Sequence, residues 1–148
     1  RLLARSAVSG SAEGIPTEVP GYPFVMFVST TLPPDLSAPA HARAQLRQSL
    51  DAWGLTDTLD DAELVTSELV ANAVRHGATP VVLTLGRRDG MLVIAVQDSA
   101  PDRLPVPRQA DAEDSGGRGM FLVRALAEQW GCCGDADTKV VWASLAAA

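Results

Sequence analysis

The 148-residue chain is poor in the features that mark secreted, membrane-spanning or nucleic-acid-binding proteins. Its two cysteines, Cys132 and Cys133, are adjacent, so they offer neither a disulfide framework nor the spacing of metal ligands. A net charge of −6 disfavours binding to a phosphate backbone, which needs clustered positive charge. No apolar run reaches the roughly 18 residues that cross a bilayer. We therefore expect a cytoplasmic protein that binds neither membrane nor, directly, nucleic acid.

Length and composition predict one globular domain with a short tail. The chain is 47% hydrophobic and only 5% aromatic, so its core is built mainly on Val, Leu and Ala. Residues 1–22 hold small residues, Gly and Pro without sustained periodicity, which predicts a flexible N-terminal tail. The ordered domain is expected at residues 23–148.

Apolar periodicity and turn residues predict the secondary structure. We expect helices at 37–53, 58–77 and 120–129 and strands at 24–32, 81–85, 91–96 and 140–145, with a weaker strand near 131–134. Ser37 is the expected cap of the first helix, and Gly54 its end. The Asp89-Gly90 pair joins two of the strands as a hairpin. The predicted fold is α+β, a two-layer α/β sandwich whose mixed, mostly antiparallel sheet is covered by helices on one face.

The second predicted helix carries an unusual polar edge. Helical geometry places Glu68 and Asn72 one turn apart on one edge, with Arg75 near it. The neighbouring positions are nearly all apolar, so this helix is expected to be buried, and a buried carboxylate is costly without a partner or a chemical task. A core helix whose polar residues make local hydrogen bonds is the other interpretation.

A glycine-rich turn follows a long polar connection at residues 99–116. Connections of more than about 12–15 residues without regular structure are usually functional lids or disordered. Gly116-Gly117-Arg118-Gly119 then opens the third helix, where backbone N–H groups and the helix dipole favour a phosphate. Such a turn also serves as a plain hinge. The chain contains neither a P-loop motif nor a glycine fingerprint directly after its first strand, so a dinucleotide-binding unit is not expected.

The order of these motifs resembles the GHKL ATPases, whose nucleotide-binding domain has the Bergerat fold. The matching residues are Glu68-x-x-x-Asn72, the strand-end Asp98, the long connection, the glycine turn and Thr138-Lys-Val. The resemblance covers about residues 24–146. It is greatest to small bacterial anti-sigma-factor serine/threonine kinases, whose helix similarly ends in Asn-Ala-x-x-His-Gly, matched here by residues 72–77.

The resemblance implies ATP and Mg²⁺ as cofactors and gives roles to individual residues. Asn72 matches the side-chain oxygen ligand of Mg²⁺, which suits a metal that keeps most of its waters and its phosphate ligands. Glu68 matches the general base, which polarises a water or a protein hydroxyl. Asp98 matches the acceptor of the adenine amine, and Thr138 the residue that supports the same edge of the base. The other nucleotide-binding residues implied by position are Arg75, His76, Gly77, Ala100, Gly117, Arg118, Gly119 and Met120.

Each assigned residue has a simpler role that the sequence leaves open. Glu68 can pair with Arg75 or another cation. Asp98 can cap a turn after its strand, and Thr138 can reflect ordinary strand propensity. His76 suits a helix C-terminus, where positive charge is favoured.

The chain departs from the family pattern around the predicted lid. Residues 98–102 read Asp-Ser-Ala-Pro-Asp where the family has Asp-x-Gly-x-Gly, and Asp137 replaces a glycine before Thr138. Ser115 stands where the kinases carry an arginine that reaches the γ-phosphate. Arg118, or Arg108 in the lid, is the candidate substitute. These changes bear on phosphoryl transfer more than on ATP binding.

The resemblance implies an anti-sigma factor with serine/threonine kinase activity toward an anti-anti-sigma protein. The alternatives are an ATP-binding interaction module without transferase activity, the ATP-binding half of a sensor histidine kinase, and an α+β domain without nucleotide. The chain has only His41 and His76 as histidines, so a histidine phosphoacceptor would have to lie elsewhere. Family members often form homodimers through the first strand. Phe24, Met26 and Phe27 suit such an interface and equally suit a core strand.

Overall fold

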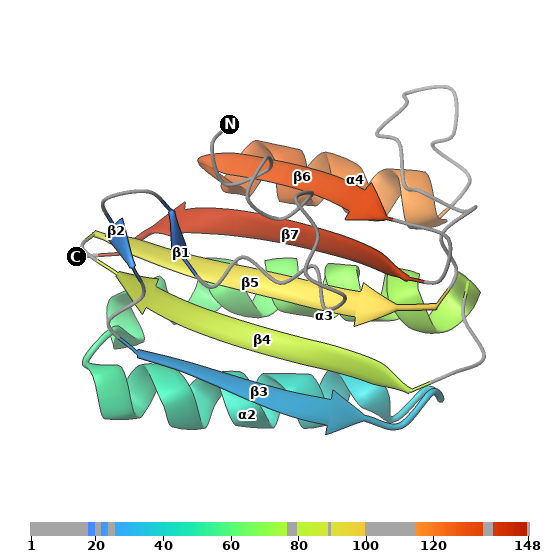
Figure 1. Cartoon of the computed structure of the whole chain (residues 1–148), viewed down its shortest axis with the longest axis horizontal. Coiled ribbons are helices and arrows are strands. Elements are labelled where there is room, and N and C mark those ends of the chain that lie inside the picture. The colour runs from blue at the N-terminus through green and yellow to red at the C-terminus, as the bar shows by residue number, and fades with distance from the viewer. Residues whose placement is uncertain are drawn as a thin grey trace.

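Five strands form one antiparallel sheet in the order β3-β4-β5-β7-β6, with helices covering one face (Figure 1). The computed structural model describes residues 18–19, 22–23, 26–76, 80–88, 90–99, 115–134 and 138–147. The strands are β3 (Met26–Leu32), β4 (Val81–Arg88), β5 (Met91–Asp98), β6 (Gln129–Gly134) and β7 (Lys139–Ala146). The α-helices are α2 (Ala38–Trp53), α3 (Leu59–His76) and α4 (Ser115–Leu126), with a 3-10 turn, η1 (Thr56–Thr58), before α3. The α+β two-layer prediction is confirmed.

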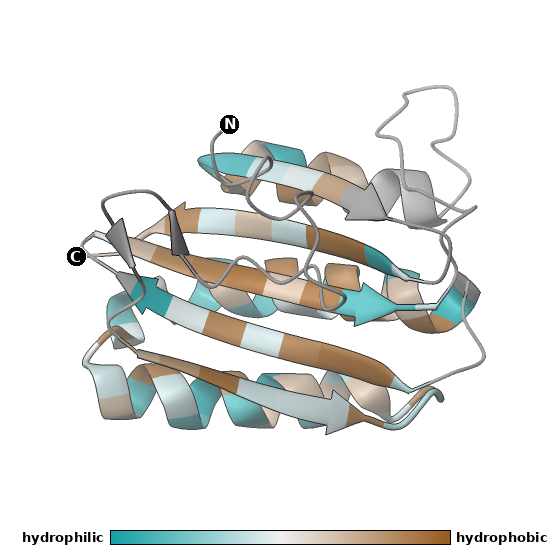
Figure 2. Ribbon diagram, viewed as in Figure 1, coloured by the Kyte–Doolittle hydropathy of each residue, from teal (hydrophilic) through white to brown (hydrophobic). Residues whose placement is uncertain are grey.

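Cross-strand register places one apolar set of side chains under the helices. Leu85 of β4 pairs with Ile94 of β5, which pairs with Ala143 of β7, and all three belong to the main core. Figure 2 shows brown, hydrophobic residues along much of β4 and β5, while the end of β5 is hydrophilic. Since side chains alternate between faces, this register fixes which residues of each strand face the helices.

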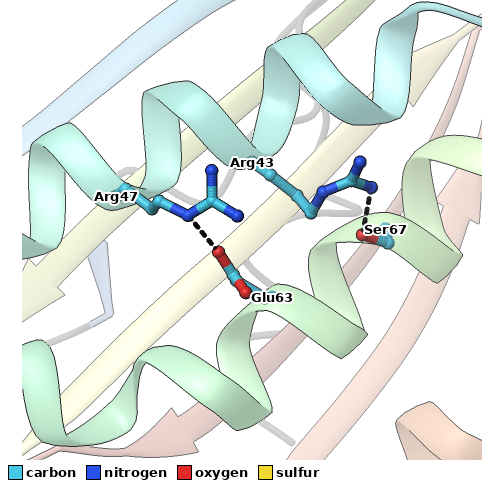
Figure 3. Close-up of polar contacts among 4 residues, drawn as sticks. All are labelled: Arg43, Arg47, Glu63 and Ser67. Carbon is cyan, nitrogen blue, oxygen red and sulfur yellow. Dashed lines mark hydrogen bonds and ion pairs between the residues drawn. The ribbon is translucent and has the colours of Figure 1, made fainter.

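Helices α2 and α3 lie side by side and are joined by apolar and polar contacts. Leu46 and Leu50 of α2 are fully buried, as the i, i+4 spacing requires. At the surface, Arg47 Nε lies 2.5 Å from Glu63 Oε2, and Arg43 donates a 3.1 Å hydrogen bond to Ser67 (Figure 3). Exposed ion pairs of this kind contribute about 0–1 kcal/mol, so the packing comes mainly from the apolar residues.

The ends of α2 test the predicted caps. Gly54 ends α2 in the left-handed conformation, with φ of 73°, as predicted. Ser37 occupies the N-cap position but makes no side-chain cap hydrogen bond; its hydroxyl and its backbone N–H instead donate to the Asp35 carboxylate. The capping role predicted for Ser37 is therefore wrong: its backbone is already helical, with φ of −81° and ψ of −12°, whereas an N-cap residue is normally extended, and the side chain that accepts a backbone N–H here is Asp35.

The other differences from the predicted elements lie at the ends. Helix α4 begins at Ser115 rather than at residue 120 and ends at Leu126, and the weakly predicted strand near 131–134 is the full edge strand β6. Two short strands, β1 (Glu18–Val19) and β2 (Tyr22–Pro23), pair across the boundary predicted between the tail and the domain. Among the described residues, no helix combines the length and apolarity needed to cross a membrane.

The edge strand β3 carries exposed apolar side chains. Met26 is 39% exposed and Phe27 56% exposed, so neither behaves as a core residue. Phe24 lies outside the described residues. Of the two interpretations offered for this strand, the structure does not support the core interpretation at Met26 and Phe27.

Gly131 of β6 is required by its neighbour Trp142 on β7. A Cβ atom at residue 131 would lie 2.9 Å from Cζ2 of Trp142, whose side chain is buried. We expect Gly131→Ala to lower the free energy of unfolding by about 1–3 kcal/mol, the usual cost of overpacking. Chemical denaturation measures this. In a Trp142→Phe background the cost should shrink, because the smaller ring leaves space, and an unchanged cost there would contradict the contact.

Candidate functional site

Helix α3 is the buried helix that the sequence predicted, and it holds the polar edge of Glu68 and Asn72. Leu69, Val70 and Ala73 are buried around them. Asn72 is only 3% exposed, whereas Glu68 is half-buried and Arg75 exposed. Glu68 and Arg75 form no ion pair with each other in the structure, so that alternative role for Glu68 is not found.

The amide of Asn72 is buried without a full set of partners. Its Nδ2 atom has no hydrogen-bond partner in the structure. Leaving a buried donor unsatisfied costs about 1–3 kcal/mol, and such groups in native proteins usually mark a ligand or a water. A half-turn about χ2 exchanges Nδ2 and Oδ1, so the same position can present an amide oxygen to a cation. The residue therefore fits a ligand-binding role.

Asp98 ends β5 on the face of the sheet that the helices cover. Its carboxylate Oδ2 lies 3.7 Å from Nζ of Lys139, the residue opposite it on β7. The two side chains are 1% and 0% exposed, respectively. The sequence singled out Asp98 but missed Lys139. The available signal was its position, since Lys139 lies two and four residues before the core residues Val141 and Ala143 and therefore faces the same side of the sheet.

The elements that carry the predicted site residues converge at one end of the sheet. Figure 1 shows the C-terminal end of α3, the end of β5, the start of β7 and the start of α4 on the same side of the molecule. Helix α3 also contacts β5, β7 and α4. Glu68, Asn72, Asp98 and Thr138 are therefore carried by neighbouring elements, with Thr138 half-buried directly before β7.

The glycine turn differs from its predicted form. Because α4 starts at Ser115, residues 116–119 belong to the first turns of the helix rather than to a loop before it. Met120 is buried in the main core. Gly77 and Ala100 lie outside the described residues, as do Arg108 and Asp137. The side chains of His76 and Arg118 lie outside them too, as does the surface of Gly117 and Gly119.

Two further observations delimit the site. A cavity of about 380 Å³ lies between β3 and α2, lined partly by Thr30, His41 and Gln45, and includes none of the predicted site residues. Within the described part of the chain, no group of three or more His, Cys, Asp or Glu side chains could hold a metal ion. A metal at Asn72 would accordingly take most of its ligands from elsewhere, as Mg²⁺ does in nucleotide sites.

A family model for the histidine kinase-like ATPase domain matches residues 32–144, about three-quarters of the chain. The chain belongs to this family. The match includes Glu68, Asn72, Asp98 and Thr138, and it confirms the resemblance to the GHKL ATPases.

A solved structure adds evidence for the fold of this histidine kinase-like ATPase domain. The crystal structure of the RsbU and RsbW domains of Rv1364c from Mycobacterium tuberculosis aligns with a TM-score of 0.64 at 22% identity. The alignment covers 83% of this chain and 33% of the other, so the chain spans about a third of that protein's length. At this identity the likeness shows the fold alone. A search of curated proteins returned no match.

Proposed function

We propose that this domain binds ATP with Mg²⁺ and acts as an anti-sigma factor that phosphorylates an anti-anti-sigma protein on serine or threonine. The observation that carries the proposal is the buried, incompletely bonded Asn72 amide, one helical turn from Glu68, in a histidine kinase-like ATPase domain. The solved structure that contains an RsbW domain supports the fold, and the resemblance to anti-sigma-factor kinases supplies the class of partner.

In the proposed site, α3 carries the metal ligand and the general base, and one end of the sheet carries the residues that contact the adenine. Asn72 would hold Mg²⁺, which when bound neutralises charge on the phosphates. Asp98 accepts a hydrogen bond from the adenine amine, with Thr138 supporting that edge. Backbone N–H groups in the first turn of α4 bind phosphate oxygens, because a helix N-terminus favours negative charge.

Glu68 acts on the partner's hydroxyl. Its carboxylate orients the hydroxyl and takes its proton as the oxygen attacks the γ-phosphorus. A new oxygen–phosphorus bond forms while the bond between the γ-phosphorus and the β–γ bridging oxygen breaks, and ADP leaves. The proton on Glu68 then returns to solvent. The half-buried position of Glu68 leaves it accessible to a docked protein.

A second candidate is an ATP-binding interaction module that transfers no phosphate. The observation that favours it is Ser115, which begins α4 where related kinases place an arginine for the γ-phosphate. Without a substitute cation, the transition state loses one source of charge stabilisation. In either function, a second copy of the chain is a proposed partner of β3, through the exposed Met26 and Phe27.

Two measurements on the purified protein test the proposal. Calorimetry should detect ATP binding that disappears when EDTA removes Mg²⁺. Incubation with γ-labelled ATP and candidate anti-anti-sigma proteins should then place an acid-stable label on the partner, because serine and threonine phosphates resist acid whereas histidine phosphate does not. Binding without any labelled partner would favour the interaction module. No binding of ATP at all would overturn both functions.

A further inference from the structure

The ion pair of Asp98 and Lys139 differs from that of Arg47 and Glu63 by its complete burial. Arg47 and Glu63 keep 56% and 23% of their side chains exposed, whereas Lys139 and Asp98 keep 0% and 1%. Removing a lysine from water is expensive, and the attraction to a carboxylate often fails to repay that cost. An apolar residue would serve the core of β7 at least as well.

The cost is informative because of where the pair lies. It closes the β5–β7 ladder at the end of the sheet, where the C-terminal end of α3 also lies (Figure 1). Lys139 directly follows Thr138, and Asp98 is the residue proposed to contact the nucleobase. The Lys139 ammonium also acts on Cys132 of β6. It lowers the pKa of the Cys132 thiol, whereas burial raises that pKa by more. Helix α3 also packs on β5 and β7, and it carries Glu68 and Arg75 close in sequence to Asn72.

We propose that Lys139 is a specificity-determining residue that holds Asp98 as a carboxylate and thereby selects nucleobases with an amino group at the contacted edge. This inference rests on the proposed ATP binding. An ionised carboxylate only accepts hydrogen bonds, and its two oxygens retain acceptor sites beside an ammonium partner. Adenine presents a donating amine at its 6-position. Hypoxanthine presents a carbonyl oxygen there, which faces the carboxylate with no proton between them.

Removal of the ammonium reverses this preference. Loss of this cation favours the protonated form of the buried Asp98 carboxyl group, because burial disfavours the charged form. The protonated group then donates a hydrogen bond, and a 6-carbonyl becomes its better partner. Hydrogen bonds to charged groups are worth about 1.5–3 kcal/mol, so we expect Lys139→Met to lower the ratio of ATP to ITP affinity by about 10- to 100-fold.

The test measures ATP and ITP binding, each with Mg²⁺, by calorimetry. The wild type should prefer ATP, and Arg47→Met, which removes the exposed ion pair, should keep that preference. Lys139→Met should lose it. Because removing one partner of a buried ion pair is strongly destabilising, the double variant Asp98→Asn with Lys139→Met serves as a second test. Its neutral amide can donate or accept, so ATP and ITP should bind within about threefold of each other.

The outcomes separate the two proposals. A wild type that binds neither nucleotide overturns the proposed function, and this inference with it. A wild type that selects ATP, together with a folded Lys139→Met or double variant that keeps the wild-type ratio, overturns the role of Lys139 alone. A uniform loss of both nucleotides in the folded double variant also overturns it, because a merely structural role predicts no change in selectivity.

Discussion

Replacing Asn72 with alanine is expected to lower the affinity for ATP with Mg²⁺ by about 100-fold or more, since even outer-shell partners of metals are worth 10–100-fold. The variant removes the only side-chain oxygen that the proposal gives to the metal. The amide is 3% exposed and incompletely bonded, so its loss should cost little folding stability. Calorimetry with and without EDTA measures the effect, and the residual binding of the variant should no longer depend on Mg²⁺.

Thr66→Val is the matched control for this experiment. Thr66 lies on the same helix, is fully buried, and its hydroxyl also has no partner in the structure. Its position six residues before Asn72 places it on a different side of α3. The variant should bind ATP like the wild type. If Asn72→Ala also binds with unchanged affinity and metal dependence, Asn72 is not the metal ligand.

Glu68→Gln is expected to slow phosphoryl transfer by about 10²- to 10⁴-fold while it leaves ATP affinity nearly unchanged. Glutamine keeps the size and polarity of the side chain but cannot take a proton from the attacking hydroxyl. Single-turnover transfer of labelled phosphate to the partner measures the rate, and calorimetry measures the binding.

Glu63→Gln is the control for the charge change. Glu63 precedes Glu68 by five residues on α3 and is paired with Arg47 of α2 (Figure 3). It should transfer phosphate at the wild-type rate and lose no more than about 1 kcal/mol of stability. Transfer by Glu68→Gln at the wild-type rate would show that Glu68 is not the base.

The sequence predicted most of the fold because its strands and helices have clear periods. The alternation of Val81, Leu83 and Leu85 and the apolar surroundings of Asn72 both led to elements that the structure contains. The start of α4 was missed because the glycines at 116, 117 and 119 lower helix propensity locally, whereas the packing of Met120 and Val123 in the core stabilises the helix.

Within the candidate site, local sequence identified single residues better than their partners. Asp98 stood out because it ends an apolar run. Lys139 did not, because its pairing depends on the register between β5 and β7, which one strand alone does not reveal. Elsewhere, the Ser37 cap was wrong because the sequence does not reveal that Ser37 has helical dihedrals and that Asp35 accepts its backbone N–H.

Helix α3 packs against α2 and α4 and against the strands β4, β5 and β7, and it also carries Glu68 and Asn72. Ligand binding at those two residues should therefore be coupled to the cooperative unfolding of the whole domain. A ligand that binds only the native state raises its stability by about 2.7 kcal/mol at a concentration 100 times its dissociation constant. A simple thermal melt should thus rank nucleotides, metals and variants of this domain without any knowledge of its protein partners.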